Sequence, residues 1–311
     1  MKIGTGFSFR SRPSFRSRPS FRSRLSFRSQ GLSAVTNHAR YAFPTGGMPD
    51  HAADPVGTAV FTTAYAVLPA DTQRDIVTSL LPGWIGHRAW ILARPLTGFA
   101  ETFAQYAVEL RPGGGSAAPD PDPGAQAAIF VAKGQLRLTI GAVAHSLRPG
   151  SFAYLPAGAP WQIWNPHDQE AGFHWIRKAY VPADGIMAPE PLILHEADIE
   201  AVGMPGAEDN WATQRFFDPL DPGYDFHVNI VNFQPGGRIP FAETHVMEHG
   251  LYVLQGTARY LLNTDWVEVG PGDFMWLRAF CPQACIATGN TAFRYLLYKD
   301  VNRHPALGPG R

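Results

Sequence analysis

Glu243-Thr244-His245-Val246-Met247-Glu248-His249 is the central stretch of residues 237–283, and the turn Gly270-Pro271-Gly272-Asp273 follows it. It places one glutamate and two histidines at positions i, i+2 and i+6. On a regular strand, residues two apart project from the same face, so these three side chains are expected to point together. Carboxylate and imidazole groups suit Mn, Fe, Ni or Zn. The stretch therefore predicts a metal site. The alternative is a set of separate polar residues, each satisfied by its own hydrogen bonds.

Short apolar runs fill most of the remaining chain. Each has the length of a strand, is rich in β-branched or aromatic residues, and ends at a turn signal such as Pro82-Gly83 or Lys133-Gly134. No long stretch repeats with the period of a helix. The pattern predicts an all-β fold. The expected strands are 62–68, 87–93, 103–110, 127–131, 135–140, 151–155, 161–164, 172–180, 226–233, 250–254, 258–262, 266–269, 274–277 and 292–298.

The two halves of the chain share one layout. Residues 130–136 align with 252–258, and residues 148–152 align with 270–274, both at an offset of 122 positions. A constant offset indicates an internal duplication. Residues 181–222 are rich in Pro, Gly, Asp and Glu and favour one short helix near 196–201. We therefore expect an extension (1–40), a first barrel (41–180), a connection (181–222) and a second barrel (223–304).

The extension differs from the rest of the chain in composition. It holds nine of the 26 Lys and Arg residues and none of the 26 Asp and Glu residues, and it repeats the unit Phe9-Arg10-Ser11-Arg12-Pro13-Ser14. Such a segment cannot build a packed core, which predicts disorder. The alternatives are a nucleic-acid or membrane-binding arm, a transit peptide, or a true start near Met48.

Charge and cysteine content argue against several functional classes. The chain after residue 40 is mildly acidic, so we expect no basic surface for nucleic acid. No apolar run approaches the ~20 residues of a membrane span. Cys281 and Cys285 form C-x3-C, not the C-x-x-C of a redox motif. We expect two buried, reduced thiols in a reducing compartment, and hence a cytoplasmic protein.

Around the metal stretch, the sequence resembles the cupin proteins. The pattern Gly237-x5-Glu243-x-His245-x3-His249-x6-Gly256 has the spacing of the first cupin motif, with the carboxylate first instead of last. Gln283 stands where cupins place a fourth ligand, normally a histidine. A Glu-His-His-Gln set resembles the (S)-ureidoglycine aminohydrolase family of bicupins. Further matching segments are Tyr65–Leu68, Leu81–Trp84, Tyr298–Asp300 and Asn302-Arg303.

The resemblance implies two tandem cupin barrels and a homo-oligomeric hydrolase that acts on a C–N bond. It implies conversion of (S)-ureidoglycine, a small ureide, to (S)-ureidoglycolate and ammonia in purine and allantoin catabolism. The implied cofactor is Mn²⁺, with the ligands Glu243, His245, His249 and Gln283. The implied catalytic groups are Glu243, also as general base, and Lys299. The implied substrate contacts are Tyr260, Tyr295 and Lys299.

The first half is expected to hold no metal. The offset of 122 maps the four ligands onto Pro121, Pro123, Ala127 and Trp161, none of which binds metal ions. The first barrel is then structural: it packs against the second barrel and builds the oligomer. His145, His167 and His174 do not restore a ligand set and are expected on the surface or in the core. Glu248 is expected to face away from the site, in a structural salt bridge or an outer contact.

Two other functions stay open at this stage. Another metal-dependent bicupin, such as a dioxygenase or an isomerase, would share the fold, because fold does not fix function. Gln283 in place of a histidine argues against iron–oxygen chemistry. A bicupin that binds a ligand without catalysis is the second alternative, and the retained ligand set and Lys299 count against it.

Overall fold

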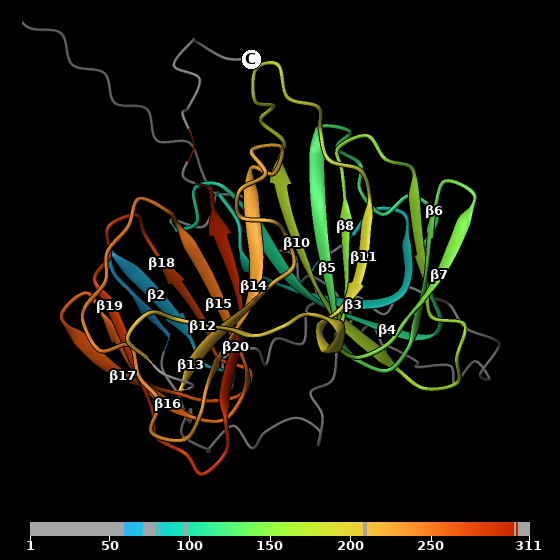
Figure 1. Cartoon of the computed structure of the whole chain (residues 1–311). Coiled ribbons are helices and arrows are strands. Elements are labelled where there is room, and N and C mark those ends of the chain that lie inside the picture. Colours follow the sequence, from blue (N-terminus) through green and yellow to red (C-terminus); the bar gives the residue numbers. More distant parts are fainter. Residues whose placement is uncertain are drawn as a thin grey trace, which may run out of the picture. The chain divides into compact units, whose positions relative to one another are not determined.

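The structure is a computed structural model that describes residues 59–70, 79, 81–95, 99–207, 210–301 and 303. The predicted extension and the predicted start of the folded body lie outside these residues. The described part is almost entirely β, as predicted (Figure 1). The strands are Val60–Phe61 (β1), Tyr65–Leu68 (β2), Trp84–Ala93 (β3), Ala104–Ser116 (β4), Ala125–Lys133 (β5), Leu136–Ile140 (β6), Val143–Leu147 (β7), Ser151–Leu155 (β8), Trp161–Trp164 (β9), Ala171–Ala179 (β10), Leu192–His195 (β11), Val202–Gly203 (β12), Trp211–Arg215 (β13), Phe226–Phe233 (β14), His249–Gln255 (β15), Ala258–Leu262 (β16), Asp265–Val269 (β17), Phe274–Leu277 (β18), Gln283–Ala287 (β19) and Phe293–Asp300 (β20).

These strands form two curled-sheet barrels, which confirms the predicted architecture. The first barrel is a nine-stranded sheet in the order β11-β8-β5-β10-β4-β9-β6-β7, with β3 paired to β4. The second barrel combines an eight-stranded sheet, β1-β2-β18-β15-β20-β14-β13-β12, with a three-stranded sheet, β17-β16-β19. Every pairing is antiparallel.

Three segments cross the boundaries expected from the sequence. In Figure 1 the blue strand β2 lies among the orange and red strands, because it pairs with β18 of the second barrel. The yellow strand β11 pairs with β8 of the first barrel, and β12 and β13 join the second barrel. The segment 181–222 is therefore not only a connection. Each added strand covers an edge whose backbone groups would otherwise lack partners. The expected short helix is a 3-10 turn at Glu196–Asp198.

The duplication extends to the pairing register. Trp161 lies opposite Ile140 in the first barrel, and Gln283 lies opposite Leu262 in the second, again 122 positions apart. The same offset relates the turn glycines Gly134 and Gly256, which have φ angles of 68° and 73°. A side chain would be strained at both, since only glycine adopts this conformation freely.

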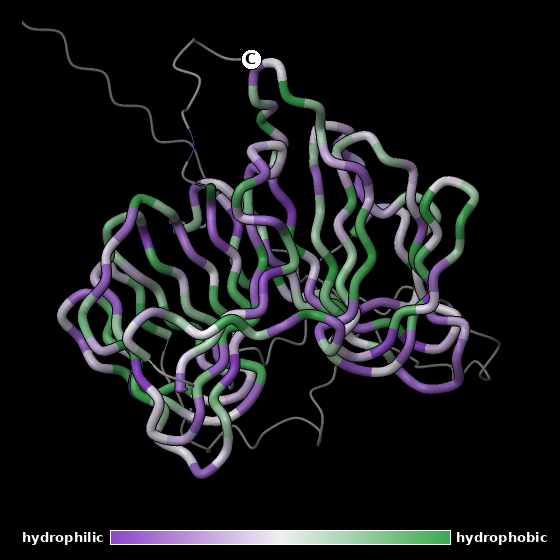
Figure 2. The backbone as a smooth tube through the Cα atoms, in the orientation of Figure 1, coloured by the Kyte–Doolittle hydropathy of each residue, from purple (hydrophilic) through white to green (hydrophobic). Residues whose placement is uncertain are grey.

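The two barrels share a buried apolar contact. Strand β14 is buried on both faces: Phe226, Val228 and Ile230 face this contact, and Val231 and Phe233 face the interior of the second barrel. The ring of Phe103 stacks on Tyr298 across the contact, with centroids 3.9 Å apart. Figure 2 shows hydrophobic and hydrophilic stretches alternating along the strands. Removing one such buried ring is expected to cost about 3–5 kcal/mol, so the contact holds the barrels together.

Two other expectations concern cysteines and membranes. Cys281 and Cys285 are free and buried, as predicted. Burial raises the pKa of both thiols, so they stay protonated and unreactive at neutral pH. In the described part of the chain, no helix is long and apolar enough to cross a membrane.

Candidate metal centre

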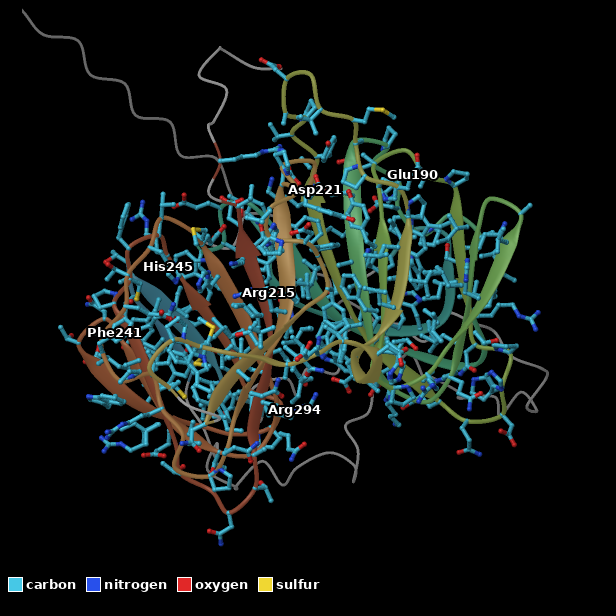
Figure 3. All side chains as sticks on the ribbon, in the orientation of Figure 1. Glu190, Arg215, Asp221, Phe241, His245 and Arg294 are labelled. Carbon is cyan, nitrogen blue, oxygen red and sulfur yellow. The ribbon has the colours of Figure 1, made fainter. Side chains whose placement is uncertain are left out.

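Two imidazoles and one amide meet at one end of the second barrel. The Nε2 atom of His245 lies 3.2 Å from Nε2 of His249 and 3.0 Å from Nε2 of Gln283. His249 is the first residue of β15 and Gln283 the first of β19, whereas His245 comes from the preceding loop (Figure 3). Three of the predicted ligands therefore meet at one point.

The predicted strand from Glu243 to His249 is wrong. Only His249 lies in a named strand, and Glu243 makes an isolated bridge with Gln283, with N···O distances of 2.9 and 3.0 Å. The carbonyl oxygen of His245 accepts a 2.8 Å hydrogen bond from the backbone nitrogen of Phe280. Backbone hydrogen bonds thus join the loop between β14 and β15 to the segment around the start of β19. These bonds, and not the alternation of side chains along one strand, bring the imidazoles together.

The electrostatics keep both imidazoles neutral. Burial, followed by the neighbouring His245, lowers the pKa of His249 to about 3. Burial, followed by Lys299, also lowers the pKa of His245. Burial raises the pKa of the Glu243 carboxyl, and Lys299 opposes that shift. A neutral imidazole has the free electron pair that a metal ion requires, so both histidines are in the ligating form.

The types of donor fit a first-row divalent ion, although the Glu243 carboxylate does not lie close enough to the two histidines to complete a ligand group. No three His, Cys, Asp or Glu side chains in the described residues form a ready metal-binding group. Nε2 of Gln283 faces His245 and Oε1 accepts a 3.0 Å hydrogen bond from the Tyr260 hydroxyl, so the amide offers its oxygen to a metal only after a flip that exchanges these two atoms. A hydroxyl both donates and accepts, so it can hold this amide in either orientation. The carboxylate of Glu243 accepts no hydrogen bond from the described residues and lines the same cavity.

A cavity of about 170 Å³ opens on these groups. Tyr295 and Lys299, predicted substrate contacts, line it together with the four predicted ligands. Tyr260 does not: it is fully buried, with its hydroxyl on Gln283 and 3.4 Å from that of Tyr295. The remaining lining residues are Met204, Trp211, Thr213, Arg215, Asn229, Val231, Met247 and Leu297.

Comparison with known proteins identifies the family. A family model described as a cupin domain matches residues 106–177 and 229–298. A rice protein (Oryza sativa subsp. japonica) named "Probable (S)-ureidoglycine aminohydrolase" is 32% identical over 237 residues, or 76% of this chain and 74% of the rice protein. The chain belongs to the (S)-ureidoglycine aminohydrolase family of cupin proteins. An Escherichia coli K12 protein named "(S)-ureidoglycine aminohydrolase" is 29% identical, over 77% of this chain and 89% of that protein.

A solved structure is also similar to this chain over most of its length. The crystal structure of the "Putative Glyoxylate Induced Protein" from Pseudomonas aeruginosa is 56% identical to this chain. It superposes with a TM-score of 0.79 and covers 88% of this chain and all of that one. The bicupin fold is therefore common to both proteins.

The sequence did not reveal the cavity residues contributed by β13. Trp211, Thr213 and Arg215 alternate along this strand and face the cavity. The alternation is visible in the sequence, but the composition of residues 181–222 predicts a connection between the barrels. Its pairing with β14 is what turns these side chains toward the site. Arg215 is consequently a cation in the cavity that the family resemblance did not supply.

The counterpart positions in the first barrel carry apolar groups. Ala127 and Trp161 stand where the second barrel has His249 and Gln283, and both are buried. A larger cavity, of about 480 Å³, lies near Trp161 and is lined largely by prolines, alanines and two aspartates. His174 is buried in the contact between the barrels, 4.0 Å from the ring of Tyr252. His145 is partly buried and His167 is exposed.

Proposed function

We propose that this chain hydrolyses (S)-ureidoglycine to (S)-ureidoglycolate and ammonia in the breakdown of purine-derived ureides. In this proposal Glu243, His245, His249 and Gln283 hold Mn²⁺. The observation that carries it is the meeting of two neutral imidazoles and an amide in a cavity also lined by Glu243 and Lys299. The names of the rice and E. coli relatives supply the substrate.

The reaction exchanges one bond at the α-carbon. The bond to the amino group breaks, a bond to the oxygen of water forms, and a proton from that water leaves with ammonia. A bound divalent cation would neutralise the substrate carboxylate and polarise the reacting carbon. In this proposal Glu243 accepts the proton of water; burial raises the pKa of its carboxyl, which lines the cavity, and both features favour a general base there.

Lys299 and Tyr295 complete the proposed site from β20. They are four residues apart on this strand and therefore face the same side. In this proposal the ammonium group of Lys299 stabilises the negative charge that develops on the substrate. Tyr295 contacts the ureido group. Tyr260 acts through Gln283, whose amide it fixes, and is a positioning residue and not a substrate contact.

Ammonia release from freshly generated (S)-ureidoglycine tests the proposal. We expect metal-stripped protein to be inactive and added Mn²⁺ to restore turnover. His245→Ala is expected to lose both bound metal and activity, whereas Lys133→Ala, which changes an exposed residue of the first barrel, is expected to keep both. Oxygen uptake in place of ammonia release would indicate a dioxygenase. Protein that neither carries nor gains metal would favour a binding protein. The expected homo-oligomer is tested separately by light scattering.

A further inference from the structure

Arg215 is the last residue of β13 and lies in the wall of the cavity that holds the predicted ligands. Its backbone pairs with Asn229, and its side chain lines the cavity with those of His245 and His249. Figure 3 marks Arg215 and His245, which come from β13 and from the loop before β15. Lys299 lies on the same face, opposite His227, the residue two positions before Asn229. The cavity therefore holds two cationic side chains near each other.

Neither cation forms an ion pair with a residue that the structure describes. In the described ranges no Asp or Glu oxygen lies within ion-pair distance of Arg215 or Lys299, although other arginines there are paired. Glu243 lines the same cavity and attracts Lys299, but it is a predicted ligand whose charge a bound cation would offset. The like charges of Arg215 and Lys299 repel each other in this half-buried cavity, so an anion that enters stabilises the arrangement. The cavity is consequently built to receive negative charge.

The first barrel neutralises its corresponding cation. Arg177 is the counterpart of Lys299 at the 122-residue offset and occupies the same place in the strand pairing. Its Nε atom donates a 2.6 Å hydrogen bond to the carboxylate of Asp120. The barrel without predicted ligands thus satisfies its cation internally, and the barrel with predicted ligands does not.

The second cation is present in one barrel alone. In the first barrel Ile91 lies opposite Tyr106, and in the second Arg215 lies opposite Asn229, with Tyr106 and Asn229 at equivalent places in the pairing. An apolar residue therefore occupies the counterpart of Arg215. Arg215 is thus a feature of the ligand-bearing barrel and not of the duplicated scaffold.

We propose that Arg215 is the specificity residue that binds the α-carboxylate of the substrate. This inference rests on the proposed function. A guanidinium presents two parallel N–H donors that match a carboxylate, and a lysine offers no such fork. With the carboxylate shared between the bound cation and Arg215, Lys299 is left to act at the reacting carbon. The site accordingly selects ureido acids over uncharged ureido compounds of the same size.

Binding of two stable analogues tests this inference without turnover. N-carbamoylglycine keeps the ureido group and the carboxylate and lacks the α-amino group; its amide keeps the shape and lacks the charge. We expect calorimetry on Mn²⁺-loaded wild-type protein to show preference for the acid. Arg215→Gln is expected to weaken binding of the acid about 10- to 100-fold, the range for a charged hydrogen-bonded group, and of the amide less than twofold. Arg215→Lys is expected to recover part of the affinity for the acid.

The control is Arg259→Gln, which removes the same charge from an exposed side chain of β16 paired with Glu268. It is expected to bind both analogues as the wild type does. Metal content and unfolding midpoints verify that each variant is folded, and Arg215→Met replaces Arg215→Gln if the latter unfolds. Equal weakening for acid and amide, or no weakening, overturns the inference. Absence of ammonia release by the wild type overturns the proposed function instead, and the analogue comparison still decides the role of Arg215.

Discussion

The carboxylate of Glu248 accepts hydrogen bonds from both the backbone nitrogen, at 2.9 Å, and the hydroxyl group of Thr102, which belongs to the first barrel. The same hydroxyl lies 2.9 Å from that of Tyr298, and the indole nitrogen of Trp276 donates to Glu248 at 2.6 Å. Glu248 precedes His249, and Tyr298 precedes Lys299. A loop of the first barrel therefore contacts the residues next to His249 and Lys299, at the ends of β15 and β20 that carry the candidate metal centre. The barrel without predicted ligands thus supports the position of these two side chains.

Thr102→Val tests this support. The substitution keeps the shape and removes one donor from a buried carboxylate, so we expect a loss of about 1–3 kcal/mol in the free energy of unfolding. Because outer contacts orient metal ligands, we also expect Mn²⁺ affinity to fall by about 10-fold or more. Denaturant unfolding and metal titration measure the two effects. Thr139→Val, on a strand of the first barrel remote from this contact, is the control. Unchanged Mn²⁺ affinity in Thr102→Val would show that the contact is only structural.

Lys299→Met is expected to separate catalysis from metal binding. It removes the charge and keeps the length of the side chain, and Lys299 is not a predicted ligand. We expect turnover to fall about 100-fold or more, the usual cost of losing one stabilising group in a transition state, with metal content unchanged. Steady-state kinetics and metal analysis measure both quantities. Lys133→Met, at an exposed lysine paired with Glu170, is expected to match the wild type. Near-normal turnover in Lys299→Met would remove this residue from the mechanism.

Tyr260→Phe removes the hydroxyl that fixes the amide of Gln283. The first barrel offers a matched control: Tyr154 donates a 2.9 Å hydrogen bond to Oε1 of Gln126, also buried. Tyr154→Phe deletes one buried hydrogen bond, whereas Tyr260→Phe deletes the bond to Gln283 and the longer, 3.4 Å contact with the Tyr295 hydroxyl. We expect Tyr154→Phe to lose about 0.5–1.5 kcal/mol of stability and Tyr260→Phe somewhat more. Only Tyr260→Phe is expected to lower metal affinity, by about 10-fold. Equal metal affinity in the two variants would contradict a positioning role for Tyr260.

His174 is expected to make stability depend on pH. Burial lowers its pKa from 6.5 to about 4. Between these values the unfolded chain binds a proton that the folded chain does not, so the free energy of unfolding falls as pH drops from above 6.5 toward 4. At about 1.4 kcal/mol per pKa unit, the contribution approaches about 3 kcal/mol.

His174→Gln is expected to reduce this pH dependence. Urea unfolding of metal-free protein at pH 8 and pH 5 gives the slope for wild type and variant. The difference between the two slopes isolates His174 from the other buried histidines. Values at pH 8, where both side chains are neutral, serve as the internal control. An identical slope in the two proteins would show that His174 does not carry the effect.

The sequence by itself determined most of the strands, the duplication and the identity of the ligand candidates, although it missed β7, β11, β12, β13 and β19. β-branched and aromatic runs such as 226–233 favour strands, and glycines such as Gly256 favour turns. Both preferences are local, so these elements can be recognised from the sequence alone. The constant offset also identified Ala127 and Trp161, which cannot bind a metal ion, as the counterparts of His249 and Gln283. These features depend on residues close in the chain or on comparison of one half with the other.

Only the tertiary structure decided which strands build each barrel and which side chains meet. Antiparallel pairing joins β2 to the distant β18 and β13 to the next strand, β14, and neither choice of partner leaves a local pattern in the chain. The same pairing turned Arg215 into the cavity. Backbone hydrogen bonds of Glu243 and His245 to the segment before β19, and not strand alternation, brought the imidazoles and the amide together. The side chains that the sequence supplied thus became a site through long-range hydrogen bonding and burial.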